Sequence, residues 1–478
     1  MTTDHMSHGD ATSAVDDSPG TIRAGIDLGT SSIKMVVLDS GHNIIIRHQV
    51  DTPWQHGPGG TADMSADALL SAVRELIGLV ETDATTAGVS HIDAIGIAGM
   101  GETGVLLDQS DTVLAPAMAW FDPRGATQVE AFPETVKKEF SGRTGLPLGS
   151  QVSAAKIAHL RDEGLRLAGT QWLNLPEFVA CRLGGDRAVE YSLTSRTGLI
   201  DQDLAAPWNA MVEALGVDEN FFPPFRHAGE PWGHVSDRFG HILAGATITV
   251  AGHDHLVAAH ASGTLTDGSY FVSMGTAEVL LRVIDEPLGF AARQRLADAL
   301  INEVHYVVPG KRVVVAGAKT GLVLGRALRM VGISDRSGRD QIDRTLDHID
   351  WSDFVPADNL VVSGARNDDG ELLVSADIDD VDPTDLIAAV IAHSNDEVAA
   401  LVDALNKELP PATRTTLSGG WAGMSALNRA RAALLPTVTV LADSQETAVG
   451  AALATHPAWS RGEFLTTPPA TTERHPTA

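Results

Sequence analysis

Apolar residues near the start of the chain gather in short runs that are separated by turn residues. Residues 23–28 and 33–39 form two such runs with Gly29-Thr30-Ser31 between them, and residues 44–50 form a third. Runs of this length bounded by turn residues are typical of β-strands. Residues 92–98 form a more continuously apolar run. The pattern therefore predicts three strands and then a buried one.

Between the third and fourth runs the apolar period changes from that of a strand to that of a helix. Residues 65–80 place apolar side chains on one helical face, namely Leu69, Leu70, Val73, Leu76, Ile77 and Val80. Residues 383–405 predict a second long helix. Alternating strands and amphipathic helices indicate an α/β protein. A chain of 478 residues is too long for one compact core, so two large domains are expected.

One local pattern occurs twice, about half a chain apart. Asp27-Leu28-Gly29-Thr30-Ser31 leads into the apolar run 33–38, and Ser273-Met274-Gly275-Thr276-Ala277 leads into the apolar run 279–284. Each copy predicts a strand, a Gly-Thr turn and a returning strand, as a duplicated domain would produce. Two such turns could hold a polyphosphate, because glycine lets backbone N–H groups approach and threonine adds a hydroxyl. The alternative is that Gly-Thr is ordinary turn chemistry.

Composition excludes several classes of partner. Acidic residues outnumber basic ones by 62 to 34, and the formal charge of −28 disfavours nucleic acids and anionic membrane surfaces. Cys181 is the only cysteine, so neither an intrachain disulfide nor a Cys-based metal site is possible, which fits a reducing cytoplasm. No apolar run approaches the roughly 20 residues of a membrane span. We therefore expect a cytoplasmic protein.

The ends of the chain resemble tails rather than folded segments. Residues 1–20 lack the pattern of a secretory signal and are expected to be disordered, with Met6 as a possible alternative start. Residues 461–478 are rich in threonine and proline and are expected to be flexible. The folded part is then expected to divide into domains at 21–248 and 249–460.

Two segments partly match known phosphate- or dinucleotide-binding motifs. Residues 99–104 match G-x-G-x-x-G after a predicted strand, which raises a nicotinamide-dependent oxidoreductase as an alternative. That motif should open a helix, whereas residues 105–108 predict a strand that would return as a hairpin. Residues 317–320 do not have the spacing of a Walker A loop.

Two aspartates follow predicted strands and are candidates for chemistry. Asp254 comes just after the apolar run 248–250, where its carboxylate could accept a hydroxyl proton as a general base. The flanking His253 and His255 raise a metal site as an alternative, and a structural role is another. Asp27 lies beside the first Gly-Thr turn, where an acid near phosphates would need Mg²⁺ between them. The alternative for Asp27 is an Asx-turn residue.

Several segments, taken in order, resemble the FGGY-type carbohydrate kinases, the group that includes glycerol kinase and xylulokinase. The similarity spans nearly the whole ordered chain. The matching segments are 26–31 with Lys34, 96–103, 120–124, 251–254, 273–276, 418–422 and 446–452.

The resemblance implies two actin-like (ribonuclease H-like) ATPase domains that flank a cleft, with ATP and Mg²⁺ between them. The first domain would mainly bind the sugar and the second mainly the nucleotide. Asp254 would be the catalytic base, Asp27 would act near the metal, and Thr276 would hold the transferring phosphoryl group. The substrate-binding residues would be Gly101, Glu102, Thr103, Trp120, Gln151, Asp254 and His255. The ATP-binding residues would be Asp27, Gly29, Thr30, Ser31, Lys34, Gly275, Thr276, Gly317, Gly321, Gly419, Gly420 and Trp421.

The departures from the family pattern concern the substrate. Glycerol kinases carry arginine where Gly101 stands and tyrosine where Gln151 stands, and the Met-His pair of xylulokinases is missing at 101–102. Glu102 would then orient substrate hydroxyls, and Gly101 would leave room for something other than glycerol. We expect a tetrulose, pentulose, hexulose or sugar alcohol as substrate. A catalytically silent ATP- or sugar-binding regulator is an alternative, and a homodimer is possible.

Overall fold

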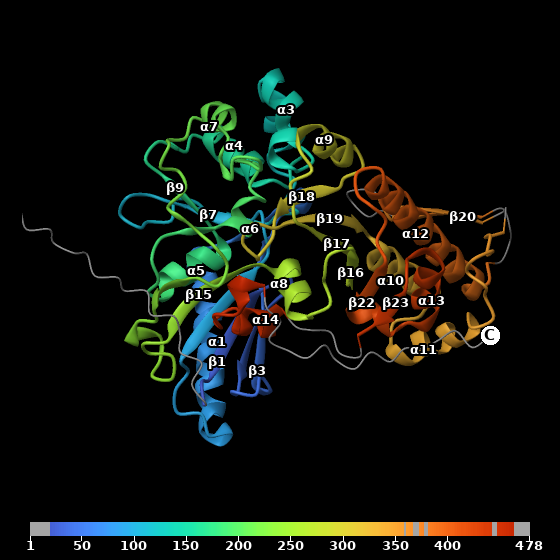
Figure 1. The fold of residues 1–478 in the computed structure, drawn as a ribbon, viewed down its shortest axis with the longest axis horizontal. Helices are drawn as coiled ribbons and strands as arrows, with labels where there is room; N and C mark the ends of the chain where they lie inside the picture. Colours follow the sequence, from blue (N-terminus) through green and yellow to red (C-terminus); the bar gives the residue numbers. More distant parts are fainter. Residues whose placement is uncertain (1–19, 358–359, 367–371, 377–380, 442–446, 463–478) are drawn as a thin grey trace, which may run out of the picture.

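Two six-stranded sheets organise the molecule (Figure 1). The computed structural model describes residues 20–357, 360–366, 372–376, 381–441 and 447–462. The first sheet contains, in spatial order, β14 (Pro231–His234), β15 (Thr247–His253), β6 (Ala94–Gly99), β1 (Arg23–Leu28), β2 (Ser32–Leu38) and β3 (Ile44–Asp51). The second contains β18 (Asn302–His305), β19 (Arg312–Ala318), β17 (Glu278–Ile284), β16 (Ser269–Met274), β22 (Arg414–Ser418) and β23 (Val438–Val440).

The two sheets repeat one topology. In the first, β1 pairs antiparallel with β2, which pairs antiparallel with β3; on its other side β1 pairs parallel with β6, and β6 with β15. In the second, β16, β17 and β19 form the same antiparallel series, and β16, β22 and β23 form the same parallel series. The duplication predicted from the repeated Gly-Thr pattern is confirmed, because both turns join the first two strands of a sheet.

The main helices and strands lie close to where the sequence predicts them. The strands expected at 23–28, 33–39, 44–50 and 92–98 are β1, β2, β3 and β6. Helix α1 (Ala66–Ala87) begins after Ser65, whose side chain accepts a hydrogen bond from the Ala68 amide, and ends at Gly88 with φ 72°. Helix α12 (Pro383–Asn406) is the second long helix that was predicted.

Shorter elements surround the two sheets. Helices α2 (Ala126–Ala131), α3 (Glu134–Thr144), α4 (Ser153–Asp162) and α7 (Asn209–Leu215) pack on one another, and α3 also packs against α9 (Phe290–Asp298). Near the second sheet lie α10 (Thr320–Met330), α11 (Arg336–Thr345) and α13 (Ser425–Leu434). Small sheets pair β4 (Gln55–His56) with β5 (Ala62–Met64) and β8 (Ala117–Met118), β10 (Val189–Glu190) with β13 (Phe225–Arg226), β11 (Ile200–Asp201) with β12 (Ala206–Pro207), and β20 (Leu360–Ser363) with β21 (Leu373–Ala376).

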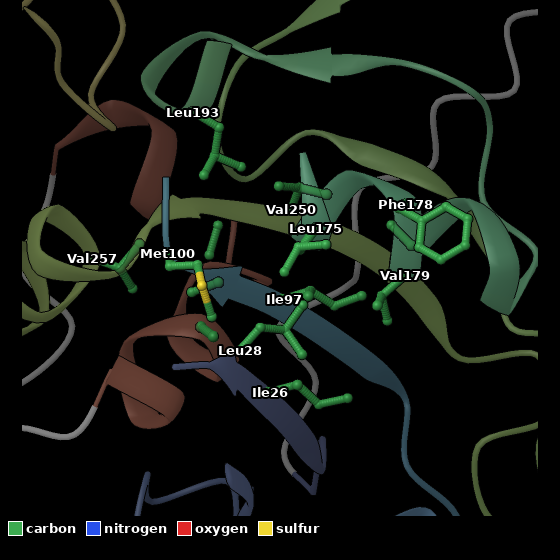
Figure 2. Close-up of a cluster of buried hydrophobic side chains, with 14 of the residues drawn as sticks. Ile26, Leu28, Ile97, Met100, Leu175, Phe178, Val179, Leu193, Val250 and Val257 are labelled. Carbon is green, nitrogen blue, oxygen red and sulfur yellow. The ribbon is translucent and has the colours of Figure 1, made fainter. Parts of the chain in front are cut away.

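One face of the first sheet is buried under α5 (Leu175–Leu183), as Figure 2 shows. Ile26 of β1, Ile97 of β6 and Val250 of β15 lie under Leu175 and Val179. All five side chains are completely buried. This apolar layer holds the three parallel strands in a fixed register, which matters because their ends carry the candidate site.

The opposite face is covered by α14 (Thr447–Leu453), which returns to the first sheet after the second is complete (Figure 1). A Cβ at Gly25 would lie 1.9 Å from the carbonyl oxygen of Ala448, and one at Gly96 would lie 1.7 Å from that of Ala451. Only glycine permits this backbone-to-backbone approach.

The structure departs from one expectation and leaves two others open. The hairpin expected after residues 99–104 is wrong: β7 (Gly104–Leu107) is a strand, but it pairs antiparallel with β9 (Gln171–Asn174) rather than with β6. The expected domain boundary at 248/249 falls within β15 and stays a prediction. The expected tails lie almost wholly outside the described residues. No helix in the described part of the chain is both long and apolar enough to cross a membrane.

Candidate active site

Three neighbouring parallel strands of the first sheet end at one edge. Asp27 of β1 stands in register with Ala98 of β6, and Ala98 with Gly252 of β15. The chain segments that follow β6 and β15 carry Glu102 and Asp254. The edge at the carboxyl ends of parallel strands is where α/β proteins bind their ligands. The backbone therefore places three carboxylates that are distant in sequence along one such edge.

Asp254 is the first residue of α8 (Asp254–Ala261). Its Oδ1 accepts a hydrogen bond from the His255 backbone N–H over 2.6 Å and lies 3.5 Å from Nδ1 of His253. Burial acts to raise the pKa of Asp254, but His255, His253 and the His255 amide together hold that pKa below its usual value. The side chain keeps 19% exposure. Asp254 is therefore an ionised, accessible carboxylate at neutral pH.

Glu102 is held in an unusual backbone conformation. Its φ is +60°, which is uncommon for a residue other than glycine. Its carbonyl oxygen accepts a hydrogen bond from Ser153 Oγ over 2.7 Å, and its Oε1 accepts one from Nε of Arg196 over 2.6 Å. Burial raises the pKa of Glu102, and the negative charge of Asp254 acts in the same direction. Strain of this kind concentrates at functional sites.

The space beside Gly101 is filled by protein. A Cβ at this position would lie 2.7 Å from Cδ2 of His253 and 3.1 Å from Cγ of Arg196. The expectation that Gly101 leaves room for substrate is therefore corrected, because His253 and Arg196 take that room. Sequence reasoning missed Arg196, and no local signal marks it, since its partner Glu102 is 94 residues away.

The first Gly-Thr turn is fixed by donors from the following loop. The carbonyl oxygen of Gly29 accepts a hydrogen bond from Thr52 Oγ1 over 2.7 Å, and that of Thr30 accepts one from Trp54 Nε1 over 2.8 Å. Ser31 is exposed at the end of the turn. Both carbonyl oxygens are thus engaged on one side of the turn, which leaves its amide N–H groups as the groups able to meet an anion.

Asp27, the candidate metal residue, is buried at the end of β1. Lys34 of β2 is its partner in the antiparallel register, so their side chains lie on one face of the sheet. A buried carboxylate and a half-buried ammonium group therefore lie next to the first turn.

The segment 120–124 joins the turn to the rest of the site. Trp120 donates from Nε1 to Thr30 Oγ1 over 3.1 Å, and its ring packs edge-on against Phe121. Asp122 has no exposed surface and accepts hydrogen bonds from Nε of Arg124 over 2.9 Å and from the Ala62 amide over 2.8 Å. Asp122 and Arg124 thus fix the segment, whereas Trp120 reaches the turn.

The remaining predicted substrate residues differ in accessibility. Gln151 is half-buried, two residues before Ser153, whose hydroxyl contacts the Glu102 backbone. The His255 ring lies 5.7 Å from the His253 ring, centroid to centroid. Thr103 has no exposed surface, so the structure does not bring its hydroxyl to a surface where a ligand could reach it.

The second Gly-Thr turn meets several of the predicted ATP-binding residues. A Cβ at Gly321 would lie 2.0 Å from the carbonyl oxygen of Gly275 and 2.6 Å from Nε1 of Trp421. The Leu322 amide, in the first turn of α10, donates to the carbonyl oxygen of Thr276 over 2.9 Å. Gly275, Thr276, Gly321 and Trp421 therefore form one surface around the start of α10.

Three further glycines predicted on the nucleotide side lie near this turn. Gly419 has φ +101°, and a Cβ there would lie 2.8 Å from the carbonyl oxygen of Met274. Gly420 begins the short 3₁₀ turn Gly420–Gly423. Gly317 is exposed in β19, in register with Val279 just after the turn.

A pocket of about 220 Å³ adjoins Trp421. Its lining combines α11 with the segment after β22, and consists of Arg336, Arg339, Asp340, Asp343, Gly420, Trp421, Gly423 and Met424. The guanidinium carbon of Arg339 lies 5.7 Å from the Trp421 ring centroid. Sequence reasoning found the glycines and Trp421 but missed the α11 side of the pocket, which comes from a separate element about 80 residues earlier in the chain.

The structure also bears on two alternative interpretations. Among the residues that the structure describes, no group of three or more His, Cys, Asp or Glu side chains could hold a metal ion. His253 ends β15 and His255 lies in α8, so the pair is not on a strand as the His-x-His metal hypothesis required. The G-x-G-x-x-G run leads into strand β7 rather than a helix, so it lacks the context of a dinucleotide-binding fingerprint.

Comparisons with known proteins identify the family of the chain. Residues 22–260, half of the chain, match a model of the N-terminal domain of the FGGY family of carbohydrate kinases. A glycerol kinase of Thermococcus gammatolerans (strain DSM 15229 / JCM 11827 / EJ3) is 25% identical over 350 residues, which cover 70% of this chain and 68% of that protein. A gluconokinase of Bacillus subtilis (strain 168) is 22% identical over 300 residues, which cover 60% of this chain and 56% of that protein, less than two thirds of its length.

The fold itself has close structural counterparts. The structure of a xyloylose kinase from Brucella ovis matches with a TM-score of 0.79 at 19% identity, covering 94% of this chain and 93% of that one. At this identity the likeness concerns the fold alone. It confirms the two-domain, duplicated actin-like architecture that was predicted, which the repeated sheet topology also shows.

Proposed function

The chain belongs to the FGGY family of carbohydrate kinases, and on that premise we propose that it transfers the γ-phosphoryl group of ATP to a hydroxyl of a small sugar or polyol. The observation that carries the proposal is the common edge of β1, β6 and β15, from which Asp27, Glu102 and Asp254 emerge. A repeated sheet offers a second Gly-Thr turn and the pocket beside Trp421. The groups proposed to bind the sugar therefore lie at strand ends of the first sheet. The groups proposed to bind the nucleotide lie at the corresponding strand ends of the second sheet.

Asp254 is proposed as the general base. A general base must be ionised and within reach of the proton that it accepts. The lowered pKa keeps Asp254 ionised at neutral pH, and its partial exposure lets a substrate hydroxyl approach. Glu102, Trp120 and Gln151 would orient that hydroxyl. Positioning supplies much of the rate of phosphoryl transfer, because the transition state needs little covalent help from the protein.

The nucleotide would bind mainly to the second half of the chain. Thr276 and the amide groups of its turn would hold the transferring phosphoryl group, and the first turn with Lys34 would meet the phosphates from the other side. The pocket between α11 and Trp421 would take the nucleoside, because it offers an aromatic face and polar groups next to the predicted Gly-Gly loop.

The residues present fit an Mg²⁺ ion carried by the phosphates. Asp27 would hold it, since Mg²⁺ prefers carboxylate oxygens and is commonly bound by one or two of them together with substrate phosphates and water. The buried position of Asp27 beside a turn whose carbonyl oxygens are engaged agrees with that role. When bound, the ion would neutralise phosphate charge.

An ADP-release assay with Mg-ATP tests the proposal directly. The panel would contain tetruloses, pentuloses, hexuloses and polyols of four to six carbons, each measured against a no-sugar control. We expect ADP release to depend on at least one neutral compound. If no sugar or polyol raises ADP release above the no-sugar control, and the protein still binds ATP, the result would instead favour a catalytically silent regulator.

A further inference from the structure

Arg196 lies in the candidate site without having been expected there. It follows the short helix α6 (Tyr191–Thr194), and its side chain is 15% exposed. Its Cγ occupies space that a side chain at position 101 would need, and its Nε donates to Glu102 Oε1 over 2.6 Å. Nη2 forms an ion pair with the same oxygen. The positive charge beside Glu102 therefore comes from a residue 94 positions later in the chain.

The turn that carries Arg196 is braced against the end of β15, directly before Asp254. Ser192 donates from Oγ to Glu190 Oε2 over 2.6 Å and accepts a hydrogen bond from the His253 amide over 3.0 Å. A Cβ at Gly252 would lie 2.5 Å from Ser192 Oγ, so the contact is close-packed. Arg196 and the proposed base are thus held in a fixed relation by one buried hydroxyl.

The Arg196–Glu102 pair keeps hydrogen-bonding capacity for a ligand. Within the described residues, both contacts of Arg196 go to Glu102 Oε1, and neither Arg196 Nη1 nor Glu102 Oε2 has a protein partner. The two partners of this one ion pair therefore keep one free donor and one free acceptor. Two adjacent hydroxyl groups can satisfy both, because each hydroxyl can donate and accept.

We propose that Arg196 is a substrate-binding residue that determines specificity, and that with Glu102 it binds two neighbouring hydroxyls of a neutral sugar or polyol. This inference rests on the proposed function. Charge favours a neutral substrate over a sugar acid: Glu102 offsets Arg196, Lys34 stands beside Asp27, and Asp254 adds a further negative charge at the same edge. A carboxylate on the substrate would meet net repulsion there.

Steady-state kinetics of two Arg196 variants test the assignment, using the neutral substrate that gives the highest kcat/KM in the panel. Arg196→Lys keeps the charge but loses the planar fork, and Arg196→Met loses both. We expect the sugar KM to rise about tenfold or more in each variant, while the KM for ATP stays within about twofold. Arg187→Met is the matched control, because Arg187 is also ion-paired, with Asp111, and similarly exposed at 22%. Its sugar KM should stay unchanged.

The outcomes separate this inference from the proposed function. An unchanged sugar KM in Arg196→Met, or a higher kcat/KM for aldonates than for neutral polyols in the unmodified chain, would overturn the inference while leaving the kinase intact. No sugar-dependent ADP release in the unmodified chain would overturn the proposed function and the inference with it. Partial recovery of the sugar KM of Arg196→Ala by added guanidinium ion would support direct contact. If Arg196→Met does not fold, Arg196→Lys, which retains the charge beside Glu102, decides the question.

Discussion

Trp120 donates a hydrogen bond from its indole Nε1 to the side-chain hydroxyl of Thr30 over 3.1 Å. This contact joins the segment expected beside the sugar to the turn expected at the phosphates. Trp54 reaches the same turn through the Thr30 carbonyl oxygen, and the Trp54 and Phe121 rings pack edge-on. The first Gly-Thr turn is therefore supported by Trp54 and by Trp120, which comes from the segment that is expected beside the sugar.

Trp120→Phe should weaken sugar and nucleotide use together. The variant keeps an aromatic ring but loses the hydrogen bond, and a bond of this kind contributes about 0.5–1.5 kcal/mol. We expect kcat/KM for both substrates to fall roughly two- to tenfold. Thr30→Val removes the other partner, so the double variant should lose less than the sum of the two single losses. If the losses of the two single variants add exactly in the double variant, the Trp120–Thr30 hydrogen bond does not couple sugar use to nucleotide use.

The sugar KM should rise as pH falls below neutrality. Burial raises the pKa of Glu102, so this carboxylate gains a proton above the usual glutamate range and then loses its ionic pairing with Arg196. The pKa of Asp254 is lowered, so the base stays ionised over the same interval and kcat should change little. Kinetics between pH 5 and 8 measure both effects. Glu102→Gln should raise the sugar KM at all pH values and remove its pH dependence. If the pH dependence of the sugar KM persists in this variant, a group other than Glu102 causes it.

Gly96→Ala should destabilise the fold. The added methyl would lie 1.7 Å from the Ala451 carbonyl oxygen, so α14 would have to move off the first sheet. Overpacking of this kind costs about 1–3 kcal/mol or more. Gly78→Ala in α1 is the control, because nothing lies within 4 Å of its added methyl and alanine favours a helix. Thermal unfolding should show a lower midpoint for Gly96→Ala and an equal or higher one for Gly78→Ala.

Gly321→Ala should impair nucleotide binding selectively. Its methyl would lie 2.0 Å from the Gly275 carbonyl oxygen and 2.6 Å from Trp421 Nε1, so the second turn and the Trp421 side of the pocket would be displaced. Gly325→Ala, one turn later in α10, places its methyl no closer than 3.6 Å to any neighbour and serves as the control. Calorimetric titration with ATP should show weaker binding for Gly321→Ala alone. Equal ATP affinities in the two variants would show that the second Gly-Thr turn is not part of the nucleotide site.

Local pattern predicted the elements well and long-range pairing poorly. The limits of β1, β2 and β3 follow from apolar periodicity and turn residues, which act within a few positions. Helix α1 begins where the pattern predicts, but it continues to Ala87, past the expected end at residue 80. The pairing of β7 with β9, about 65 residues later, leaves no mark in the local pattern, so the expected hairpin was wrong. The requirement for glycine at Gly25 and Gly96 arises from α14, at the far end of the chain.

In the candidate site, too, the sequence predicts residues marked by a local pattern and misses those placed by long-range contacts. Asp27 and Asp254 could be recognised because each stands at the end of an apolar run. Arg196 could not, because its place beside Glu102 depends on how the segment after β10 folds back against β15. The meaning of Gly101 was misread for the same reason: its small size accommodates neighbours from other elements rather than substrate.

The central claim is that Asp254 is the base of a sugar-dependent kinase, and Asp254→Asn tests it most directly. Asparagine keeps the size of the side chain and can still accept the His255 hydrogen bond, but it cannot take a hydroxyl proton at neutral pH. We expect kcat for sugar-dependent ADP release to fall about 10²- to 10⁴-fold, with ATP affinity and thermal unfolding unchanged. Turnover that remains at the unmodified level in a folded, ATP-binding Asp254→Asn protein would contradict the account.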